Sequence, residues 1–488
     1  MVVHHQTHGS AVPLPLVRTL PWREPYAAAL LLARRWGRDG LVLLDTHSSG
    51  EPGAHPHQAG VSRWSFLGTA PIRQVCCQSW PAPGHGCSPP HGDDPFTLLR
   101  QAMPERGSWR CPAAETPFMG GWMGWLSYEA GAWLERHPPW RRPDQPLLWA
   151  GLHDPLLCFD LLERRVLAVS HGFTGAGRER NAALAVQRQD TLVELWAGSP
   201  PPALEKAEPV QGAWAWHTSG AEFARQVAQL KERIEAGDIF QANLSCCCEA
   251  LLPKPPDPLQ LYGRLRQRSP VPFGGLVIRG EHALLSASPE RFLRVWGDGR
   301  VETRPIKGTR ARHQDPAQDA ALAVELITSS KDRAENIMIV DLLRNDLGRV
   351  CRPGTITVPT LVGLESYRQV HHLTSVVTGQ LRTDRDALDL LRNAWPGGSI
   401  TGAPKVRACQ RLAELEPLPR GPYCGSLFWL GLDGSLDSNI VIRSVIQKGC
   451  RLRAHAGCGI VSDSDPAEET REMDLKMAPL LQLLQPAP

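Results

Sequence analysis

The sequence predicts an α+β protein, because segments patterned as strands and as amphipathic helices follow one another irregularly along its 488 residues. Residues 221–235 carry apolar side chains at helical spacing, which predicts a helix that begins near residues 219–220. Residues 237–238, Gly-Asp, end this helix, and a strand is expected over 239–251. Strand pairs mixed with helices in this way do not fit a doubly wound nucleotide-binding fold.

Two further helices and several strands are expected later in the chain. The helices are predicted over 334–347 and over 467–484, and the second of them begins after Pro466. Strands are expected between the helices, at 275–278, 283–286, 425–432 and 440–446. This mixture supports the α+β class for residues 215–485, which we predict to form one region.

Residues 1–205 differ in composition, since they are rich in proline, tryptophan and arginine and contain many short segments. Strands are predicted at 40–45 and 63–68. The glycines and aromatic residues of 120–129 favour a closely packed strand pair. The run Ser-Pro-Pro-Pro at 199–202 predicts a linker, so the boundary between the two regions is expected there.

Composition and charge argue against several classes of protein. The formal net charge of +3 is nearly neutral, so nothing indicates a nucleic-acid or anionic-membrane partner. No apolar run reaches the roughly 18 residues that a membrane span needs, and the first residues lack the layout of a signal peptide. We therefore expect a cytoplasmic protein. The 13 cysteines are irregularly spaced, with three consecutive at 246–248, and do not indicate a disulfide framework.

Lysine is rare in this chain, which draws attention to the segment Pro-Ile-Lys-Gly-Thr-Arg at 305–310. The sequence contains 8 lysines against 45 arginines. Arginine keeps its charge at any ordinary pH, whereas lysine can lose its proton and attack carbon. Taken alone, Lys307 would fit an ordinary surface lysine after a strand, so the neighbouring motifs must decide between the two interpretations.

Eight further motifs accompany this segment in order along the chain. They lie at 237–245, 286–292, 331–336, 341–346, 370–373, 396–405, 423–426 and 457–461, the last followed by Glu469, Glu472 and Lys476. With these motifs the chain resembles the chorismate-utilising enzymes. Its Pro-Ile-Lys-Gly-Thr segment resembles the aminodeoxychorismate branch of that family, whereas anthranilate and salicylate synthases carry Ala where Lys307 stands.

The resemblance implies a fold, an activity and a partner. The fold would be two packed antiparallel sheets flanked by helices, in which residues 1–205 resemble the N-terminal region of anthranilate synthase component I and join the same globule. Residues 215–485 would bind chorismate and aminate it to 4-amino-4-deoxychorismate, on the route to p-aminobenzoate and folate. No Gly-x-Cys-x-Gly nucleophile elbow is present, so the resemblance implies ammonia from a separate glutamine amidotransferase subunit. Two alternatives are an anthranilate synthase component I and a catalytically silent chorismate-binding regulatory subunit.

An acidic cluster is expected to hold a magnesium ion. Glu469, Glu472 and Lys476 share one face of the predicted helix, at i, i+3 and i+7, which alone would also fit a solvated, salt-bridged face. Carboxylate oxygens suit magnesium. The resemblance makes Glu335 and Glu472 the ligands, with Glu469 and Asp332 close by or acting through water, and the role of Asp332 stays open.

The resemblance also assigns residues to the substrate. Arg443 would bind the pyruvyl carboxylate, since its guanidinium can bind a carboxylate bidentately, and Tyr423 would lie beside it. Gln241 stands where salicylate and isochorismate synthases carry the lysine that activates water, and a glutamine cannot serve as that base. The remaining substrate positions are Thr401, Gly402, Gly457, Gly459 and Lys476, whereas Lys405 is not assigned.

Three residues are expected to carry the catalysis. Lys307 would attack C2 of chorismate while the C4 hydroxyl leaves, assisted by Glu290 as an acid and base and by His372 as a hydrogen-bond donor. Ammonia would then attack C4 and expel Lys307. Asp45 and residues 63–66 fall near the region that holds tryptophan in relatives, and whether tryptophan binds here stays open.

Overall fold

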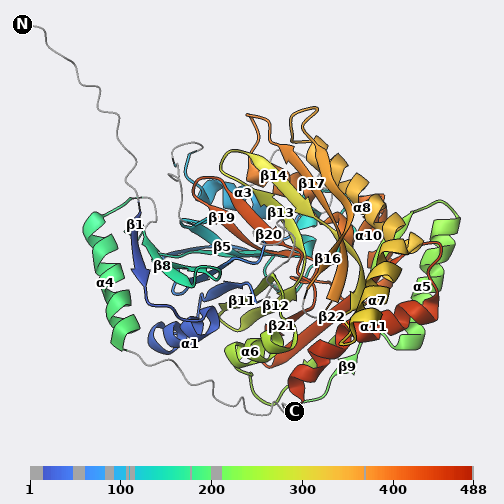
Figure 1. Ribbon diagram of the computed structural model, residues 1–488, viewed down its shortest axis with the longest axis horizontal. Coiled ribbons are helices and arrows are strands. Elements are labelled where there is room, and N and C mark those ends of the chain that lie inside the picture. The colour runs from blue at the N-terminus through green and yellow to red at the C-terminus, as the bar shows by residue number, and fades with distance from the viewer. Residues whose placement is uncertain are drawn as a thin grey trace, which may run out of the picture.

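Two large antiparallel sheets form the centre of the computed structural model, which describes residues 15–47, 61–82, 93–105, 109, 116–175, 179–198, 212–367 and 370–485 (Figure 1). The predicted linker at 199–202 lies outside these residues. The α+β class and the two antiparallel sheets expected from the sequence are confirmed.

The first sheet contains 12 strands, and every pairing in it is antiparallel. Its order is β1 (Leu16–Leu20), β8 (Arg165–Ser170), β7 (Leu156–Asp160), β3 (Trp64–Gly68), β2 (Val42–Asp45), β11 (Phe273–Arg279), β12 (His282–Ser288), β21 (Ser444–Lys448), β22 (Arg451–Ile460), β10 (Gln241–Leu251) and β18 (Gly402–Ala403), with β9 (Ala215–Trp216) also on β10.

The second sheet contains 10 strands and is also antiparallel throughout. Its order is β15 (Ile306–Ala311), β17 (Val370–Gln380), β14 (Arg300–Arg304), β13 (Arg291–Val295), β20 (Leu436–Asn439), β19 (Ser426–Gly431), β5 (Gly121–Leu126), β6 (Leu148–Leu152) and β4 (Arg73–Cys77), with β16 (Thr357–Ser366) also on β17. Strands β2 and β11 pair across the first sheet and β5 and β19 across the second, so the two predicted regions share both sheets.

Helices cover the outer faces of the sheets. The first sheet packs against α1 (Pro25–Trp36), α4 (Ala182–Gly198), α5 (Gly220–Glu235), α6 (Pro258–Arg268), α10 (Lys405–Leu415) and α11 (Pro466–Leu481). The second packs against α3 (Pro95–Ala102), α7 (Pro316–Thr328) and α8 (Ser330–Gly348), and α9 (Ala387–Ala394) contacts α3 and α8. Short 3-10 helices complete the fold at η1 (Tyr128–Trp133), η2 (Gly398–Ile400) and η3 (Gln482–Leu484).

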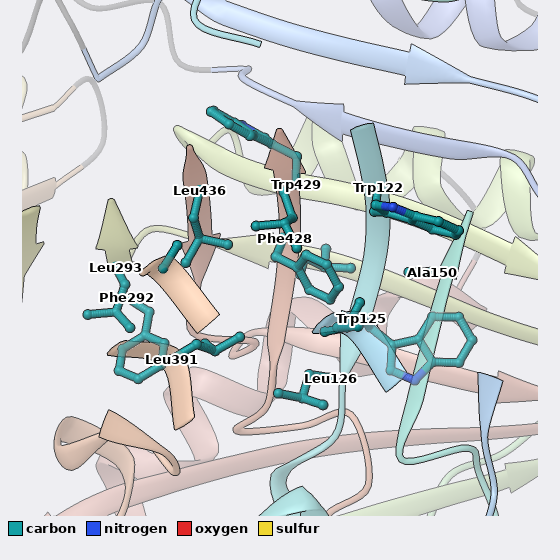
Figure 2. Packing of buried hydrophobic residues seen from close by; sticks show 14 of the residues in the cluster. Trp122, Trp125, Leu126, Ala150, Phe292, Leu293, Leu391, Phe428, Trp429 and Leu436 are labelled. Carbon is teal, nitrogen blue, oxygen red and sulfur yellow. The ribbon is translucent and has the colours of Figure 1, made fainter. Parts of the chain in front are cut away.

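Large apolar side chains fill the space between the sheets. Trp122 and Trp125 of β5 and Phe428 and Trp429 of the paired strand β19, labelled in Figure 2, belong to a buried cluster that also takes Phe66 from the first sheet. A second buried cluster lies between the first sheet and its helices. Burial of this apolar surface fixes which face of each strand points inward.

The helix boundaries follow the capping residues. Ser219 accepts a hydrogen bond from the backbone of Glu222 and so caps α5 close to the predicted start. Ser329 caps α8, which begins four residues before the predicted start at 334. Asp465 caps α11, and the predicted 467–484 divides into α11 and η3.

Two strand predictions are wrong in detail. Residues 120–129 form one strand, β5, followed by a 3-10 helix, and its glycines serve close sheet packing: a Cβ on Gly124 would lie 2.0 Å from the carbonyl oxygen of Trp149. The strand expected at 440–446 begins only at Ser444, because Arg443 adopts a left-handed conformation with φ of 51°.

Among the described residues, no helix is both long and apolar enough to cross a membrane.

Candidate active site

A cavity of about 980 Å³ brings most of the predicted site residues together. Its walls come from β15, β17, β22, α8 and α11, elements that lie far apart in the sequence. Eleven of the fourteen predicted residues line it: Glu290, Lys307, Glu335, His372, Tyr423, Arg443, Gly457, Gly459, Glu469, Glu472 and Lys476. Gln241, Thr401 and Gly402 lie behind this lining.

Three carboxylates in the cavity each face a lysine. Nζ of Lys476 lies 2.6 Å from Oε1 of Glu472 and also donates to the carbonyl of Gly457. Lys331 donates to Oε1 of Glu469 at 2.9 Å. Lys307 faces the third carboxylate, which belongs to Glu335. Sequence reasoning gave Lys331 no role, although it begins the motif that contains Glu335.

Glu335 pairs more loosely with its lysine. Its Oε2 lies 3.8 Å from Nζ of Lys307, and both side chains are largely buried. Burial raises the pKa of Glu335, which the nearby charges of Lys307 and Lys331 oppose. Burial also acts to raise the pKa of Glu472, but the ammonium of Lys476 outweighs it and the net shift is downward.

The donor set fits a magnesium ion. Carboxylate oxygens from α8 and α11 face the same cavity, and hard oxygen ligands are what magnesium prefers. The side-chain atoms of Cys458, Glu469 and Glu472 lie within 4.8 Å of one another. Burial raises the pKa of the Cys458 thiol to about 12, and this thiol donates to the backbone carbonyl of Glu469. Cys458 is therefore a neutral packing group, and the carboxylate oxygens are the candidate ligands.

Glu290 has the properties of an acid. Its side chain is buried, and burial raises its pKa to about 7, against the opposing effects of a hydrogen bond from Ser399 and the charges of Lys307 and Arg443. A carboxyl with this pKa is substantially protonated near neutral pH and can donate a proton to a leaving group.

His372 has the properties of a neutral hydrogen-bonding group. Burial, with the neighbouring charge of Arg443, lowers its pKa to about 3, so the ring is uncharged near neutral pH. Its Nδ1 forms a 2.8 Å hydrogen bond with the hydroxyl of Thr309, and its ring meets the ring of Tyr367 edge-on. These contacts hold the imidazole in one orientation over the cavity.

Arg443 places a positive charge in the lining of the cavity. Burial lowers its pKa, which Glu290 partly opposes, yet a guanidinium stays charged. Its backbone lies in the left-handed region, where a residue with a side chain is strained, and its carbonyl accepts a hydrogen bond from Ala287. The turn between β20 and β21 therefore aims this guanidinium at the cavity.

Tyr423 stacks on a residue that sequence reasoning missed. The ring of His455 lies parallel to it, with centroids 4.8 Å apart, and lines the same cavity. His455 stands two and four residues before Gly457 and Gly459 on β22, so the period of two in a strand would have placed it on their face. Burial lowers its pKa to about 3, and its Nε2 has no partner among the described residues.

Gly459 makes room for functional atoms. A Cβ at this position would lie 3.0 Å from Nζ of Lys307, 3.2 Å from Nε2 of Gln241 and 3.3 Å from Oε2 of Glu335. The glycine was expected to let a carboxylate approach its backbone, and the structure adds that it admits Lys307. Gly457 is required by packing, because its Cβ would lie 2.4 Å from the carbonyl oxygen of Leu244.

The three residues behind the lining shape the backbone. The side chain of Gln241 is fully buried at the start of β10, and neither of its polar atoms has a partner among the described residues. Thr401 donates to the carbonyl of Gly397, and Gly402 pairs with Ala242. Lys405, left unassigned above, is tied to Asp346 and lies outside the cavity lining.

A second cavity of about 330 Å³ lies between the two sheets. Asp45, Trp64 and Phe66 line it together with Arg291 and Arg294. Residues near the expected tryptophan region therefore face this second cavity and not the one that holds Lys307. Oδ2 of Asp45 accepts hydrogen bonds from two side chains of α6, at 2.9 and 3.0 Å.

Comparison with known proteins relates this geometry to one family. The family model described as chorismate binding enzyme matches residues 88–482. Anthranilate synthase component 1 of Streptomyces coelicolor is 39% identical over 430 residues, which cover 86% of this chain and 80% of that protein. Aminodeoxychorismate synthase component 1 of Klebsiella aerogenes is 38% identical over 394 residues, covering 80% and 83% respectively.

Solved structures resemble the fold. Anthranilate synthase component I from Streptococcus pneumoniae superposes with a TM-score of 0.73 at 28% identity, over 86% of this chain and 92% of that one. The menaquinone-specific isochorismate synthase MenF from Escherichia coli gives a TM-score of 0.71 at 19% identity, over 97% and 96%. The second likeness concerns the fold alone.

Proposed function

The chain belongs to the family of chorismate-binding enzymes, and from this premise we propose that it is an aminodeoxychorismate synthase component 1. It would convert chorismate and ammonia to 4-amino-4-deoxychorismate, a step toward p-aminobenzoate and folate. The observation that carries the proposal is the place of Lys307, whose amine points into the cavity beside Glu335 and Gly459. Relatives of both names are similar to the chain to nearly the same degree, so the site has to decide.

Lys307 supplies the nucleophile. Its neutral amine attacks C2 of chorismate while the C4 hydroxyl departs, so that one C–N bond forms and one C–O bond breaks. Ammonia then attacks C4, and the bond between C2 and Lys307 breaks to regenerate the lysine. An arginine at this position could not react, because a guanidinium does not shed its proton.

Glu290 and His372 assist the departure of the hydroxyl. Glu290 gives its proton to the leaving oxygen, which departs as water, and its pKa of about 7 keeps that proton available near neutral pH. His372 is neutral and hydrogen-bonds the same oxygen. Arg443 and Tyr423, which line the same cavity, hold the pyruvyl carboxylate.

Magnesium is the cofactor that the acidic cluster fits. Glu335 and Glu472 would hold it, with Glu469 close by or acting through water. When bound, the ion would bind the ring carboxylate of chorismate and withdraw electron density from the ring.

The ammonia would come from a separate glutamine amidotransferase subunit. The sequence lacks a nucleophile elbow for glutamine hydrolysis, and relatives are named component 1. We expect the purified chain to form product from chorismate, magnesium and ammonium, but not when glutamine replaces ammonium. Turnover of glutamine by the chain alone would contradict this assignment.

A second candidate is anthranilate synthase component 1, which the relative from Streptomyces coelicolor favours. In that reaction ammonia would attack C2 directly and no bond to Lys307 would form. Chromatography of the products separates the two functions, since one yields aminodeoxychorismate and the other anthranilate. A silent regulatory subunit would yield neither product.

Intact-mass spectrometry tests the role of Lys307. With chorismate and magnesium but no ammonia, the native chain should carry a covalent adduct and Lys307→Ala should carry none. Lys331→Ala is the matched control, because it removes another lysine from the same cavity and should keep the adduct at saturating magnesium. Near-native aminodeoxychorismate formation by Lys307→Ala would refute covalent catalysis and leave Lys307 as an anion-binding residue.

A further inference from the structure

The metal-site carboxylates are already occupied by lysines of the chain. Of only 8 lysines in 488 residues, three pair with Glu335, Glu469 and Glu472. A carboxylate oxygen that binds a divalent ion cannot keep a lysine ammonium at the same place, because the two cations repel each other. Magnesium and these lysines therefore compete, and a displaced lysine needs a new partner.

Lys307 has the weakest of the three pairs and the nearest alternative partner. Its 3.8 Å separation from Glu335 is the longest, against 2.9 Å for Lys331 and 2.6 Å for Lys476. Nζ of Lys307 and Nε2 of Gln241 both lie within 3.2 Å of the point that a Cβ on Gly459 would occupy. The lysine amine and the carboxamide therefore border the same small space.

Gln241 is an unusual residue in its present contacts. Its side chain is 0% exposed, and both its carboxamide oxygen and its carboxamide nitrogen lack partners among the described residues. A buried polar group without a hydrogen bond destabilises a fold, because its lost hydration is not replaced. Such a group in a native fold calls for an explanation, and a role in the function is one that the surroundings of Gln241 support.

We propose that Lys307 exchanges partners during metal loading, leaving Glu335 for the carboxamide oxygen of Gln241 when Glu335 binds the magnesium ion. Gln241 is then a positioning residue, which keeps the amine beside Gly459 and in the cavity. A half-turn of the terminal amide presents Oε1 in place of Nε2, and that oxygen accepts a hydrogen bond from the lysine. The inference rests on the proposed function, through the magnesium site at Glu335 and Glu472.

The neutral charge of Gln241 suits this role. A carboxylate at its position would pair with the ammonium of Lys307 and oppose release of the amine toward substrate. An apolar residue would leave the displaced amine without an acceptor in a buried place. A carboxamide holds the amine by one hydrogen bond, which is weak enough to break when the lysine bonds to carbon.

Gln241→Met tests the inference, because the variant should be more stable to heat but should bind magnesium more weakly. Methionine has a similar length and removes both unpartnered polar atoms, so the thermal unfolding midpoint without magnesium should rise, by about 1–3 °C. Magnesium binding, measured by calorimetry with MgCl₂ and no chorismate, should weaken by roughly tenfold, because Lys307 loses its acceptor. A glutamine that merely supported the fold would give a lower midpoint and unchanged affinity.

A double-mutant cycle separates partner exchange from general electrostatics. Lys307→Met should bind magnesium about tenfold more tightly, since no ammonium has to be displaced from Glu335. Adding Gln241→Met to Lys307→Met should then change the magnesium affinity little, because the lysine that would donate a hydrogen bond to Gln241 is already absent. Lys331→Met is the control, as it removes the same charge from the cavity but leaves Lys307, so Gln241→Met should still weaken binding in that background.

The outcomes decide the inference without reference to the product. An equal weakening by Gln241→Met with and without Lys307 would overturn it, and so would unchanged affinity in the single variant. Failure of the proposed function would appear separately, as anthranilate or no product from the native chain, because calorimetry with the metal alone does not depend on which nucleophile attacks chorismate.

Discussion

Ionising the buried carboxyl of Glu290 should destabilise the fold, and the substitution Glu290→Gln measures this effect. Burial raises the pKa of this carboxyl from 4.5 to about 7. Each unit of pKa difference between the native and unfolded chain corresponds to about 1.4 kcal/mol, so ionised Glu290 costs the native state on the order of 3 kcal/mol. Glutamine has nearly the same shape and carries no ionisable group.

The direction of the pH dependence follows from the two pKa values. The native chain binds the proton of Glu290 more tightly than the unfolded chain, so the contribution of this group to stability is fully present below pH 4.5 and is lost as the pH rises through 7. Glu290→Gln lacks this loss. The free energy of unfolding of the variant, relative to the native chain, should therefore increase by about 3 kcal/mol between pH 4.5 and pH 8.

Urea denaturation at four or five pH values across this window measures the difference. Asp319→Asn is a control of the opposite kind, because the hydrogen bond from Arg312 lowers the pKa of Asp319. Its effect should be constant above pH 5 and disappear only as the pH falls below the unfolded value. A difference between Glu290→Gln and the native chain that stays flat from pH 4.5 to 8 would refute the assignment of Glu290 as a buried acid.

Three further substitutions test two contacts of the site and one of the fold. Gly459→Ala places a Cβ 3.0 Å from Nζ of Lys307 and should reduce product formation at least tenfold with little change in the unfolding midpoint; an active variant would show that the lysine has room to move. Arg420 lies outside the cavity lining and pairs with the buried carboxylate of Glu416. Arg420→Met leaves that carboxylate with only its hydrogen bonds from Ser245 and should lower the free energy of urea unfolding by about 3–5 kcal/mol; a loss below 1 kcal/mol would contradict that pairing. Glu472→Gln should raise the magnesium concentration needed for half-maximal rate, and an unchanged requirement would remove Glu472 from the ligands.

Motif spacing predicted which residues meet better than it predicted how. Glu472 and Lys476 share a helix face by local geometry alone, and the structure pairs them at 2.6 Å. Their approach to Lys307 depends on long-range packing, because Lys307 lies on β15 of the second sheet whereas α11 packs on β22 of the first, and no local pattern encodes this. The resemblance supplied that long-range information, because its motifs come from proteins that already have this fold.

The errors have physical causes at particular residues. Arg443 was placed within a strand because its neighbours are β-branched, and nothing in a local pattern indicates a left-handed arginine. His455 was missed because the motif that predicted this part of the site begins at Gly457, two residues later on β22. Gln241 was expected at a substrate position, yet it is not among the residues that line the cavity, and its Nε2 lies 3.2 Å from the point that a Cβ on Gly459 would occupy.

Acidic and basic side chains balance each other's charge in the cavity. Six acidic side chains, three lysines and four arginines line the cavity, and each of the residues Glu335, Glu469 and Glu472 faces its own lysine. Such a balance keeps the site folded, since an unpaired buried carboxylate would be costly. It also means that a divalent cation must displace ammonium groups, so the lysine proposed to form the covalent bond is the one held least closely. Three of the 8 lysines of the chain line this cavity, and a lysine, unlike an arginine, can release its proton and react there.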